Sequence, residues 1–439
     1  MGTLTFCGAC GTVTGSLYLL ETSGKKLLIE CGLYQGPEAE KINPFFPFDP
    51  SSIDYVILTH AHLDHSGRLL ELVRDGFRGE ILTTPATIEL LKIVLEDRLH
   101  LEPNIGPKEL VKKVLELCWP FEYGEFCDIP GGIHFRLRDA GHILGSAHLE
   151  LWCEGKKFVF SGDIGRVGTP IIRDPSPPED ADFLVMESTY GGRRHPPLKL
   201  AKKQLRLIIE KAREKKARVF IPSFAIGRTQ ELLYFLNELV ENEEMEPLPV
   251  IVDSPMALKV TKVYAKYTEL YDEEALERLA RGDRIFSFPL LFSAATVEAS
   301  RRIEDLDPPY VVIAGSGMVT GGRIVEHLKR HLPERQTFVV FVGFQAEGTP
   351  GRKILHRHPK VKLDHEIVEN RARIFRIEAF SAHADHEELL DWLGKFKKIP
   401  RKIFLTHGEP GARFALLQAI EERFETQVKT PSLMKRFAF

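Results

Sequence analysis

The chain has 439 residues and a formal net charge of −3, and apolar residues make up 43% of it and charged residues 28%. This composition is typical of a globular protein of about two to three domains, and it excludes nucleic-acid binding through overall positive charge. No stretch has the ~18 uncharged apolar residues of a membrane-spanning helix, and residues 1–6 show no secretory signal, so we expect a cytoplasmic protein.

Short β-rich runs alternate with turns over the first ~190 residues. Apolar content and length predict buried strands at 17–20, 26–29, 55–58, 158–160 and 183–186. Apolar residues recurring at three and four predict helices at 68–74 and 88–95. Residues 170–178, rich in Pro and Asp, are predicted to form a loop.

The pattern changes near residue 198. Long amphipathic helices (198–216 and 230–241) then alternate with apolar strands at 219–221, 250–252, 311–314 and 338–341. This alternation indicates a parallel α/β sheet. After residue 351 the first style returns, with strands at 373–377 and 403–405 that each lead into a His-bearing loop. We therefore predict an α/β domain (198–351) inserted between two parts of another domain (1–197 and 352–439).

Six cysteines in a chain of this length do not form a disulfide framework. Cys7 and Cys10 form a CxxC pair, a spacing that zinc and redox sites also use. No second CxxC pair completes a zinc site and no thioredoxin-like context surrounds this one. We interpret the pair as two small residues where a strand enters a turn.

The densest chemical signal is the run from His60 to His65, HAHLDH, directly after the predicted strand at 55–58. Residues two apart in an extended loop point the same way, so His60 and His62 can bind one ion. Asp64 and His65 fall at the start of a helix predicted to begin near Ser66, where they can serve a second ion. Imidazole and carboxylate ligands at this density suit zinc.

Further candidate metal ligands lie in turns and just after other predicted strands. His142 lies in a Gly-flanked turn, where His148 competes with it as a ligand, and Asp163 follows the predicted strand at 158–160 in a turn. His407 follows the predicted strand at 403–405. Each of these residues by itself is also a common loop residue.

Together these segments resemble the metallo-β-lactamase superfamily and, within it, its β-CASP branch of nucleic-acid nucleases. The HxHxDH run at 60–65, His142 and Asp163 match the superfamily's metal-binding motifs, whereas Glu187, His383 and His407 match β-CASP motifs A, B and C. The resemblance covers essentially the whole chain. It is closest to compact bacterial and archaeal relatives of the endonuclease subunit of the cleavage and polyadenylation specificity factor. It implies an αββα sandwich with an inserted α/β β-CASP domain that carries a parallel sheet.

The resemblance also implies the roles of individual residues. One zinc ion would be held by His60, His62 and His142 and a second by Asp64, His65 and His407, with Asp163 bridging them. A hydroxide bound to both ions would attack phosphorus and leave 5′-phosphate and 3′-hydroxyl ends. Asp64, Glu187 and His383 are the catalytic candidates, with His383 as general acid oriented by Glu187. Substrate phosphates would contact Ser223, Arg228, Gly315, Ser316 and Gly317.

One position departs from the family. The first motif, normally Asp-Cys-Gly, reads Glu30-Cys31-Gly32 here, and its acidic residue generally supports the metal site without binding the metal. We expect the extra methylene of Glu30 to tune activity without abolishing it.

Several alternatives stay open beside a ribonuclease acting on single-stranded RNA. The chain could be another hydrolase of the superfamily (a thioesterase, a glyoxalase-like enzyme or a β-lactamase), although the inserted domain argues against a small substrate. It could be a DNA nuclease of the β-CASP branch, but such members tend to carry Val where this chain has His407. It could also be an inactive scaffold subunit of an RNA-processing complex, although all seven ligands are present. Endonuclease or exonuclease mode and a possible homodimer are undecided.

Overall fold

The chain folds into two units, one inserted into the other. The structure is a computed structural model that describes residues 2–36 and 39–439. The first unit comprises residues up to 167, 172–194 and 383–439, and the second comprises residues 168–171 and 195–382. The predicted insertion is therefore present, with the chain entering the second unit near His195 and leaving it after Ala382.

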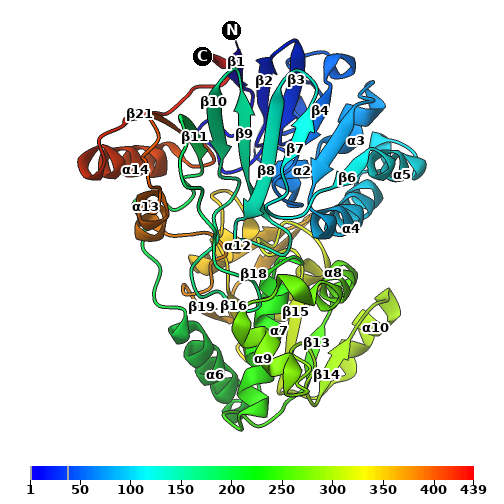
Figure 1. The fold of residues 1–439 in the computed structure, drawn as a ribbon. Helices are drawn as coiled ribbons and strands as arrows, with labels where there is room; N and C mark the ends of the chain where they lie inside the picture. The colour runs from blue at the N-terminus through cyan, green and yellow to red at the C-terminus, as the bar shows by residue number, and fades with distance from the viewer. Residues whose placement is uncertain (1, 37–38) are drawn as a thin grey trace. The chain divides into compact units, whose positions relative to one another are not determined.

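The first unit is built on two seven-stranded sheets (Figure 1). One has the order β22-β1-β2-β3-β4-β5-β6 and the other the order β21-β20-β11-β10-β9-β8-β7. The strands of the first sheet are β1 (Thr3–Phe6), β2 (Tyr18–Thr22), β3 (Lys25–Ile29), β4 (Tyr55–Ile57), β5 (Glu80–Thr83), β6 (Cys118–Pro120) and β22 (Lys435–Ala438). Those of the second are β7 (Cys127–Ile129), β8 (Ile133–Asp139), β9 (Ala147–Cys153), β10 (Lys156–Phe160), β11 (Phe183–Met186), β20 (Lys402–Leu405) and β21 (Gln427–Lys429).

Facing side chains of the two sheets form one apolar core. Phe6 comes from the first sheet and Phe135 and Phe158 from the second, and all three are fully or almost fully buried. Burying a Phe side chain contributes about 1.5–3 kcal/mol, so this layer stabilises the sandwich substantially. The chain ends lie side by side because β22 pairs antiparallel with β1 (Figure 1).

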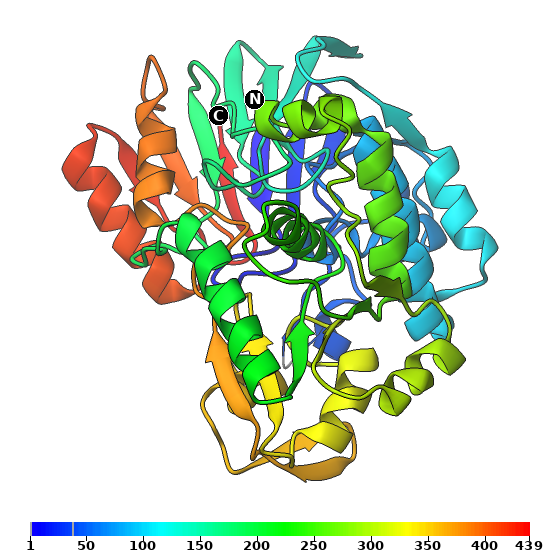
Figure 2. The same cartoon turned by 90° about the horizontal axis from the view of Figure 1, so that it is seen from below.

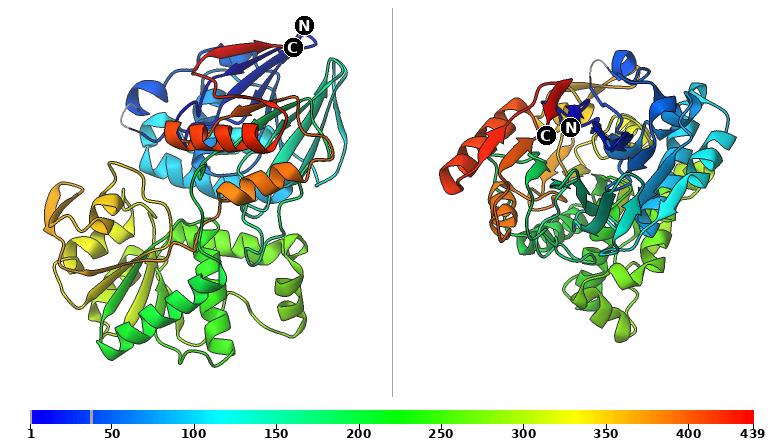
Figure 3. Two further views of the ribbon diagram at one scale, coloured as in Figure 1. Left: turned by 90° about the vertical axis from the view of Figure 1, so that its left-hand side faces the viewer. Right: turned by 45° about the horizontal axis from the view of Figure 1, so that its top comes forward.

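Helices cover the outer faces of this sandwich. They are α1 (Ala39–Ile42), α2 (Leu63–Ser66), α3 (Leu69–Arg74), α4 (Pro85–Leu101), α5 (Glu109–Glu116), α13 (His386–Gly394) and α14 (Pro410–Arg423). Leu389 of α13 and Leu416 of α14 pack in a second core with Val159 and Leu184 of the second sheet. These two helices are orange and red in Figure 3. The αββα sandwich that the resemblance implies is confirmed.

The second unit has a six-stranded sheet of order β14-β13-β15-β12-β16-β19, in which every neighbouring pair is parallel. Its strands are β12 (Arg218–Pro222), β13 (Val250–Val252), β14 (Leu291–Ser293), β15 (Tyr310–Ala314), β16 (Thr337–Phe341) and β19 (Arg373–Arg376), with a hairpin of β17 (Lys360–Leu363) and β18 (Glu366–Glu369). Its helices are α6 (Lys199–Glu214), α7 (Arg228–Glu241), α8 (Pro255–Lys266), α9 (Glu273–Ala280), α10 (Val297–Arg301), α11 (Arg323–His331) and α12 (Pro350–Leu355). Every residue of β15 and β16 is buried, as expected for central parallel strands.

The second domain boundary lies later than the predicted residue 351. Strand β19, predicted at 373–377 as part of the first domain, pairs in parallel with β16 and so extends the sheet of the second unit (Figure 2). Ile374 of β19 belongs to the same apolar core as Val339 of β16. The segment from 352 to 382 therefore belongs to the inserted unit, and the chain returns to the first unit at His383.

The structure contains neither a disulfide among the cysteines nor, in its described residues, a helix suited to a membrane. All six cysteines are free, and burial raises the pKa of the Cys7 thiol to about 12 and that of Cys10 to about 11. Both thiols are therefore protonated near neutral pH and are poor nucleophiles. Among the described residues, no helix is long and apolar enough to cross a membrane.

Candidate metal centre

Three neighbouring parallel strands carry polar residues just past their ends. Asp163 follows β10, Glu187 follows β11 and His407 follows β20, and these strands pair in the order β10-β11-β20. Parallel strands end at the same edge of a sheet, so residues far apart in the sequence meet there. This edge is the base of the candidate site.

The HAHLDH run reaches the same place from the other sheet. It begins three residues after Ile57, the last residue of β4, and its second half forms the short helix α2. His62 takes the position before the first helical residue, so the helix begins at Leu63 instead of near Ser66 as predicted. Asp64 lies in its first turn and His65 in its last.

Two glycines allow loops to approach one another closely at this site. A Cβ atom at Gly32 would lie 1.8 Å from the carbonyl oxygen of Asp64, and one at Gly165 would lie 1.6 Å from that of Gly141. Both neighbours are backbone atoms that cannot move away cheaply. These glycines therefore hold the Glu30 loop against the HAHLDH run, and the Asp163 loop against the His142 loop.

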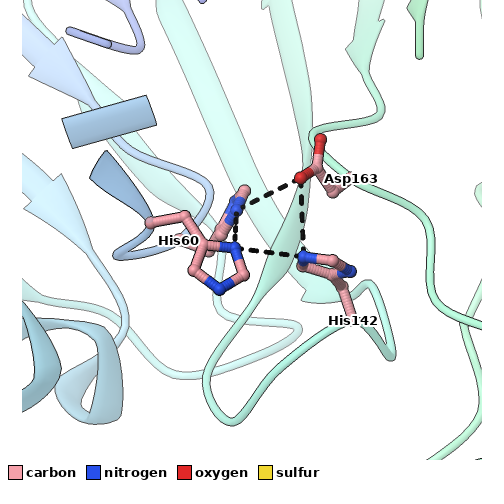
Figure 4. A group of neighbouring side chains, drawn as sticks. His60, His142 and Asp163 are labelled. Atoms are coloured by element: carbon pink, nitrogen blue, oxygen red, sulfur yellow. Dashed lines mark hydrogen bonds and ion pairs between the residues drawn. The ribbon is translucent and has the colours of Figure 1, made fainter. Parts of the chain in front are cut away.

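The first ligand group consists of His60, His62, His142 and Asp163, of which Figure 4 labels His60, His142 and Asp163. Nδ1 of His62 lies 3.1 Å from Nε2 of His60 and 3.2 Å from Nε2 of His142. Oδ2 of Asp163 lies 3.4 Å from each of those two Nε2 atoms. Ligands about 2.1 Å from a tetrahedral zinc ion are about 3.4 Å from one another, so this spacing fits zinc.

The second group consists of Asp64, His65 and His407, with Asp163 beside them. Nε2 of His65 lies 3.2 Å from Nε2 of His407 and 3.2 Å from Oδ1 of Asp163. Oδ2 of Asp64 lies 3.3 Å from Nε2 of His407. Asp163 thus directs Oδ2 to the first group and Oδ1 to the second. Oδ1 is buried and makes no hydrogen bond among the described residues, which suits an atom that binds a cation.

The protonation of the first group also suits a metal. Burial, with the neighbouring His60, lowers the pKa of His62 to about 3, and burial likewise lowers the pKa of His60 and of His142. Neutral imidazole is the form that binds metal ions. Burial acts against the charge of Asp163, but the surrounding histidines outweigh it and hold its pKa well below the usual range.

Two residues of the first sheet's loops orient the ligands from behind. The Thr59 hydroxyl is 2.9 Å from Nδ1 of His60, which leaves Nε2 facing the other ligands. The buried Glu30 accepts a hydrogen bond from the Thr59 amide through Oε1, at 3.1 Å, and its Oε2 lies 3.6 Å from Nδ1 of His65. Glu30 is thus placed behind the ligands and outside both groups, where a supporting carboxylate is expected.

His383 and Glu187 form a pair beside the first group. Nδ1 of His383 lies 3.3 Å from Oε1 of Glu187, and its ring centroid lies 4.5 Å from that of His142. The His383 loop is held to the Asp163 loop because Ala384 donates its amide hydrogen to the carbonyl of Ile164, at 2.7 Å. Burial disfavours a charged imidazole, but Glu187 and Asp163 outweigh it and raise the pKa of His383 to about 9.

The structure distinguishes between His142 and His148 as candidate metal ligands. His148 is fully buried, with Nδ1 2.6 Å from the carbonyl of Ser161, and its Nε2 accepts a hydrogen bond from the indole of Trp392 at 3.2 Å. Both of its nitrogens are therefore used within the core. His142 instead joins the first ligand group.

The five predicted substrate contacts lie in the second unit, at the carboxyl ends of β12 and β15. Ser223 donates its amide hydrogen to the carbonyl of Ala314, so the loops that hold Ser223 and Gly315–Gly317 are adjacent. Ser316 pairs its hydroxyl with that of Thr320 at 3.0 Å. Arg228 is buried, forms an ion pair with Glu231 and lies 5.3 Å from the ring centroid of Phe380. Its guanidinium is thus committed within the unit.

Two threonines contact ligand histidines in the structure, and the sequence did not predict these contacts. Thr59 precedes His60, and Thr189 lies two residues after Glu187, yet neither residue type suggests a role by itself. A Thr directly before a ligand His at a strand end was the available signal for Thr59. The contact of Thr189 with His407 joins residues 218 positions apart and leaves no local signal.

Comparison with known proteins agrees with this geometry. Residues 10–223 match the model of the metallo-β-lactamase superfamily, residues 229–354 that of the Beta-Casp domain, and residues 367–431 that of the Zn-dependent metallo-hydrolase RNA specificity domain. The chain is 40% identical to ribonuclease TTHA0252 of Thermus thermophilus over 411 residues, which cover 93% of this chain and 94% of that protein. The chain belongs to the β-CASP family of the metallo-β-lactamase superfamily.

More distant relatives of this β-CASP chain are also similar along most of its length. Transcription termination factor FttA of Methanocaldococcus jannaschii is 31% identical over 453 residues, which cover 98% of this chain and 70% of that protein. A crystal structure of a protein of unknown function from Enterococcus faecalis V583 has a TM-score of 0.57 at 12% identity and covers 99% of both chains. That likeness concerns the fold alone.

Proposed function

We propose that this β-CASP chain is a zinc-dependent ribonuclease that binds two zinc ions and leaves 5′-phosphate and 3′-hydroxyl ends. The observation that carries the proposal is the combination of two ligand groups beside Asp163 with the His383–Glu187 pair, in which His383 lies 3.3 Å from Glu187 and 3.9 Å from Asp163. The ligand groups alone would serve many hydrolases. The added pair supplies what phosphodiester cleavage further needs, a proton donor for the leaving oxygen.

The donor set supports zinc at both groups. Five imidazoles and two carboxylates are the nitrogen and oxygen ligands that zinc prefers, and no cysteine is among them. When bound, two zinc ions would supply Lewis acidity that activates water and offsets phosphate charge. The protein's part is to hold seven ligands in place through Thr59, Glu30 and the close loop contacts at Gly32 and Gly165.

We propose His383 as the residue that protonates the leaving 3′-oxygen. Its Nδ1 lies 3.3 Å from Oε1 of Glu187, and we propose that Nε2 carries the proton to substrate. Glu187 receives hydrogen bonds on both oxygens, from the Ile164 amide at 2.6 Å and from the Thr189 hydroxyl at 2.5 Å, so its own orientation is well determined. Asp64, also predicted to be catalytic, is proposed as a ligand of the second ion.

The choice of RNA as substrate has two supports. Residues 367–431 match a domain described as an RNA specificity domain, and the relative from Thermus thermophilus is named a ribonuclease. In parallel α/β sheets, ligands bind beyond the carboxyl ends of the strands. We therefore propose that Ser223, Ser316 and the amides of Gly315 and Gly317 contact phosphates of single-stranded RNA. Arg228 would contribute charge while remaining paired with Glu231.

The test is cleavage of one RNA labelled in separate samples at its 5′ or its 3′ end, with zinc or with excess chelator. Cleavage that stops with chelator supports the proposal, and the sizes of the 5′-labelled products separate exonuclease from endonuclease action. The same sequence as single-stranded DNA is the matched substrate control. Preferential cleavage of the DNA would show that DNA, and not RNA, is the substrate. Absence of cleavage of both the RNA and the DNA would favour the scaffold alternative.

A further inference from the structure

Thr189 connects the second ligand group to the Glu187–His383 pair. Its hydroxyl oxygen lies 2.5 Å from Oε2 of Glu187 and 3.0 Å from Nδ1 of His407. Both neighbours are buried, at 1% and 3% exposure, whereas Thr189 itself is partly buried. One small side chain thus contacts two of the three β-CASP motif residues.

The direction of these two hydrogen bonds follows from the chemistry of the partners. An ionised carboxylate can only accept, so Thr189 donates its single hydroxyl hydrogen to Glu187. The carbonyl of His407, at 3.3 Å, is a more distant acceptor for the same hydrogen. The hydroxyl then has only lone pairs left for His407, so Nδ1 of His407 must carry the ring hydrogen. Nε2 is consequently bare, and it is the atom that faces Asp64 and His65.

Glu187 extends this connection to His383. Its Oε2 accepts from Thr189, while its Oε1 accepts from the Ile164 amide and faces Nδ1 of His383. The order of contacts is therefore His407, Thr189, Glu187, His383. A ligand of the second group and the proposed proton donor are oriented through one carboxylate and one hydroxyl.

We propose that Thr189 is a positioning residue that selects the metal-binding tautomer of His407 and aligns Glu187. This inference rests on the proposed two-zinc function. Without the hydroxyl, Nδ1 of His407 loses its acceptor and the ring can carry its hydrogen on Nε2, the form that cannot bind a metal. Loss of a partner of this kind typically weakens metal affinity or activity ~10- to 100-fold.

The test compares Thr189→Val, which keeps the shape but removes the hydroxyl, with Thr189→Ser, which keeps the hydroxyl. Thr189→Ala, made in parallel, removes the hydroxyl without the bulk of valine. Thr406→Val is the matched control. Thr406 directly precedes His407 in the sequence, but its hydroxyl accepts a hydrogen bond from Tyr18 at 2.9 Å, so this variant removes a hydroxyl whose described partner is Tyr18. The main readout is release of zinc from the full chain to a competing chelator, which needs no RNA.

In Thr189→Val and Thr189→Ala, one of the two zinc equivalents should bind ~10- to 100-fold more weakly, with Thr189→Ser and Thr406→Val within about threefold of wild type. Unchanged zinc affinity in Thr189→Val overturns the inference. So does equal loss in Thr189→Ser or in Thr406→Val, because the hydroxyl would then not be the cause. If the zinc result holds but the wild type cleaves no RNA, only the proposed function fails. If RNA is cleaved but zinc affinity is unchanged in Thr189→Val, only this inference fails.

Discussion

Nδ1 of His383 lies 3.3 Å from Oε1 of Glu187, and neither residue belongs to the seven proposed ligands. Hydrogen bonds between the loop that carries His383 and the loop that carries Asp163 hold the pair in place. The Ala384 amide donates a hydrogen bond to the carbonyl of Ile164, and the Ile164 amide in turn donates one to Oε1 of Glu187. Proton donation and metal binding are therefore assigned to different side chains, and variants can separate them.

The first prediction is that His383→Ala slows RNA cleavage ~10²- to 10⁴-fold, because the leaving oxygen loses its proton donor. Zinc content should remain near the wild-type value. The matched control is His386→Ala, since His386 lies three residues later and bonds only the Gly192 amide among the contacts described for its side chain. It should cleave RNA at nearly the wild-type rate. Loss of zinc from His383→Ala would show that His383 is a ligand.

The second prediction concerns the bridging position. Asp163→Ala removes a ligand from both groups and should leave no tightly bound zinc, whereas His62→Ala affects the first group only and should retain about one ion per chain. Neither variant should cleave RNA. Zinc per chain after dialysis is the measurement, with His134→Ala, a surface histidine paired with Asp128, as the control. Equal zinc content in Asp163→Ala and His62→Ala would argue against a bridge.

The third prediction concerns the unusual acid of the first motif. Glu30→Gln keeps an acceptor for the Thr59 amide but removes the negative charge that lies 3.6 Å from Nδ1 of His65. Zinc should bind ~10-fold more weakly at the second group, because the basicity of His65 falls. Chelator competition measures the change. Wild-type affinity in Glu30→Gln would mean that Glu30 acts through shape alone.

The fourth prediction concerns pH and stability. Burial lowers the pKa of His148 to about 4, and Arg138 lowers it further, while the hydrogen bond to Ser161 and the carboxylates of Glu150 and Glu187 oppose the shift. Because the folded pKa lies below the unfolded value of 6.5, His148 contributes stability above pH 6.5 that is lost as pH falls towards 4. At 1.36 kcal/mol per pH unit, the loss is about 3 kcal/mol.

His148→Gln provides the comparison, because glutamine can donate to Ser161 and accept from Trp392 without titrating. Denaturant unfolding of the metal-free proteins at pH 7 and pH 4.5 gives the two free energies of unfolding. The ligand histidines titrate in both proteins and cancel in the difference. The wild type should lose more stability than His148→Gln over this range. An equal loss would mean that the pKa of His148 is not lowered in the folded protein.

How much the sequence could predict depended on how local each feature is. Strand β11 was predicted with its observed bounds, and the HAHLDH run was recognised because its ligands lie within six residues after an apolar strand. Whether β19 would join a sheet of the first unit or the sheet of the second unit was not predictable. Its apolar content fits either unit, and only pairing with β16 decides between them.

The supporting contacts were beyond sequence reasoning for the same reason. His142 and His148 lie in one segment, and the burial of His148 against Trp392, 244 residues away, decides which of them is left for the metal group. Arg228 remains a proposed phosphate contact, and its ion pair with Glu231 on the same helix was not predicted from the sequence. In both cases the folded structure supplies a contact that the residue type does not reveal.

The most direct test of the account is a titration of the metal-free chain with zinc, in which RNA cleavage and bound zinc are measured on the same samples. If two ions act together across Asp163, cleavage should stay near background until the first equivalent is bound and should rise with the second. The new ends should be 5′-phosphate and 3′-hydroxyl. Full cleavage with one zinc ion per chain, or cleavage that continues in excess chelator, would contradict the two-zinc ribonuclease.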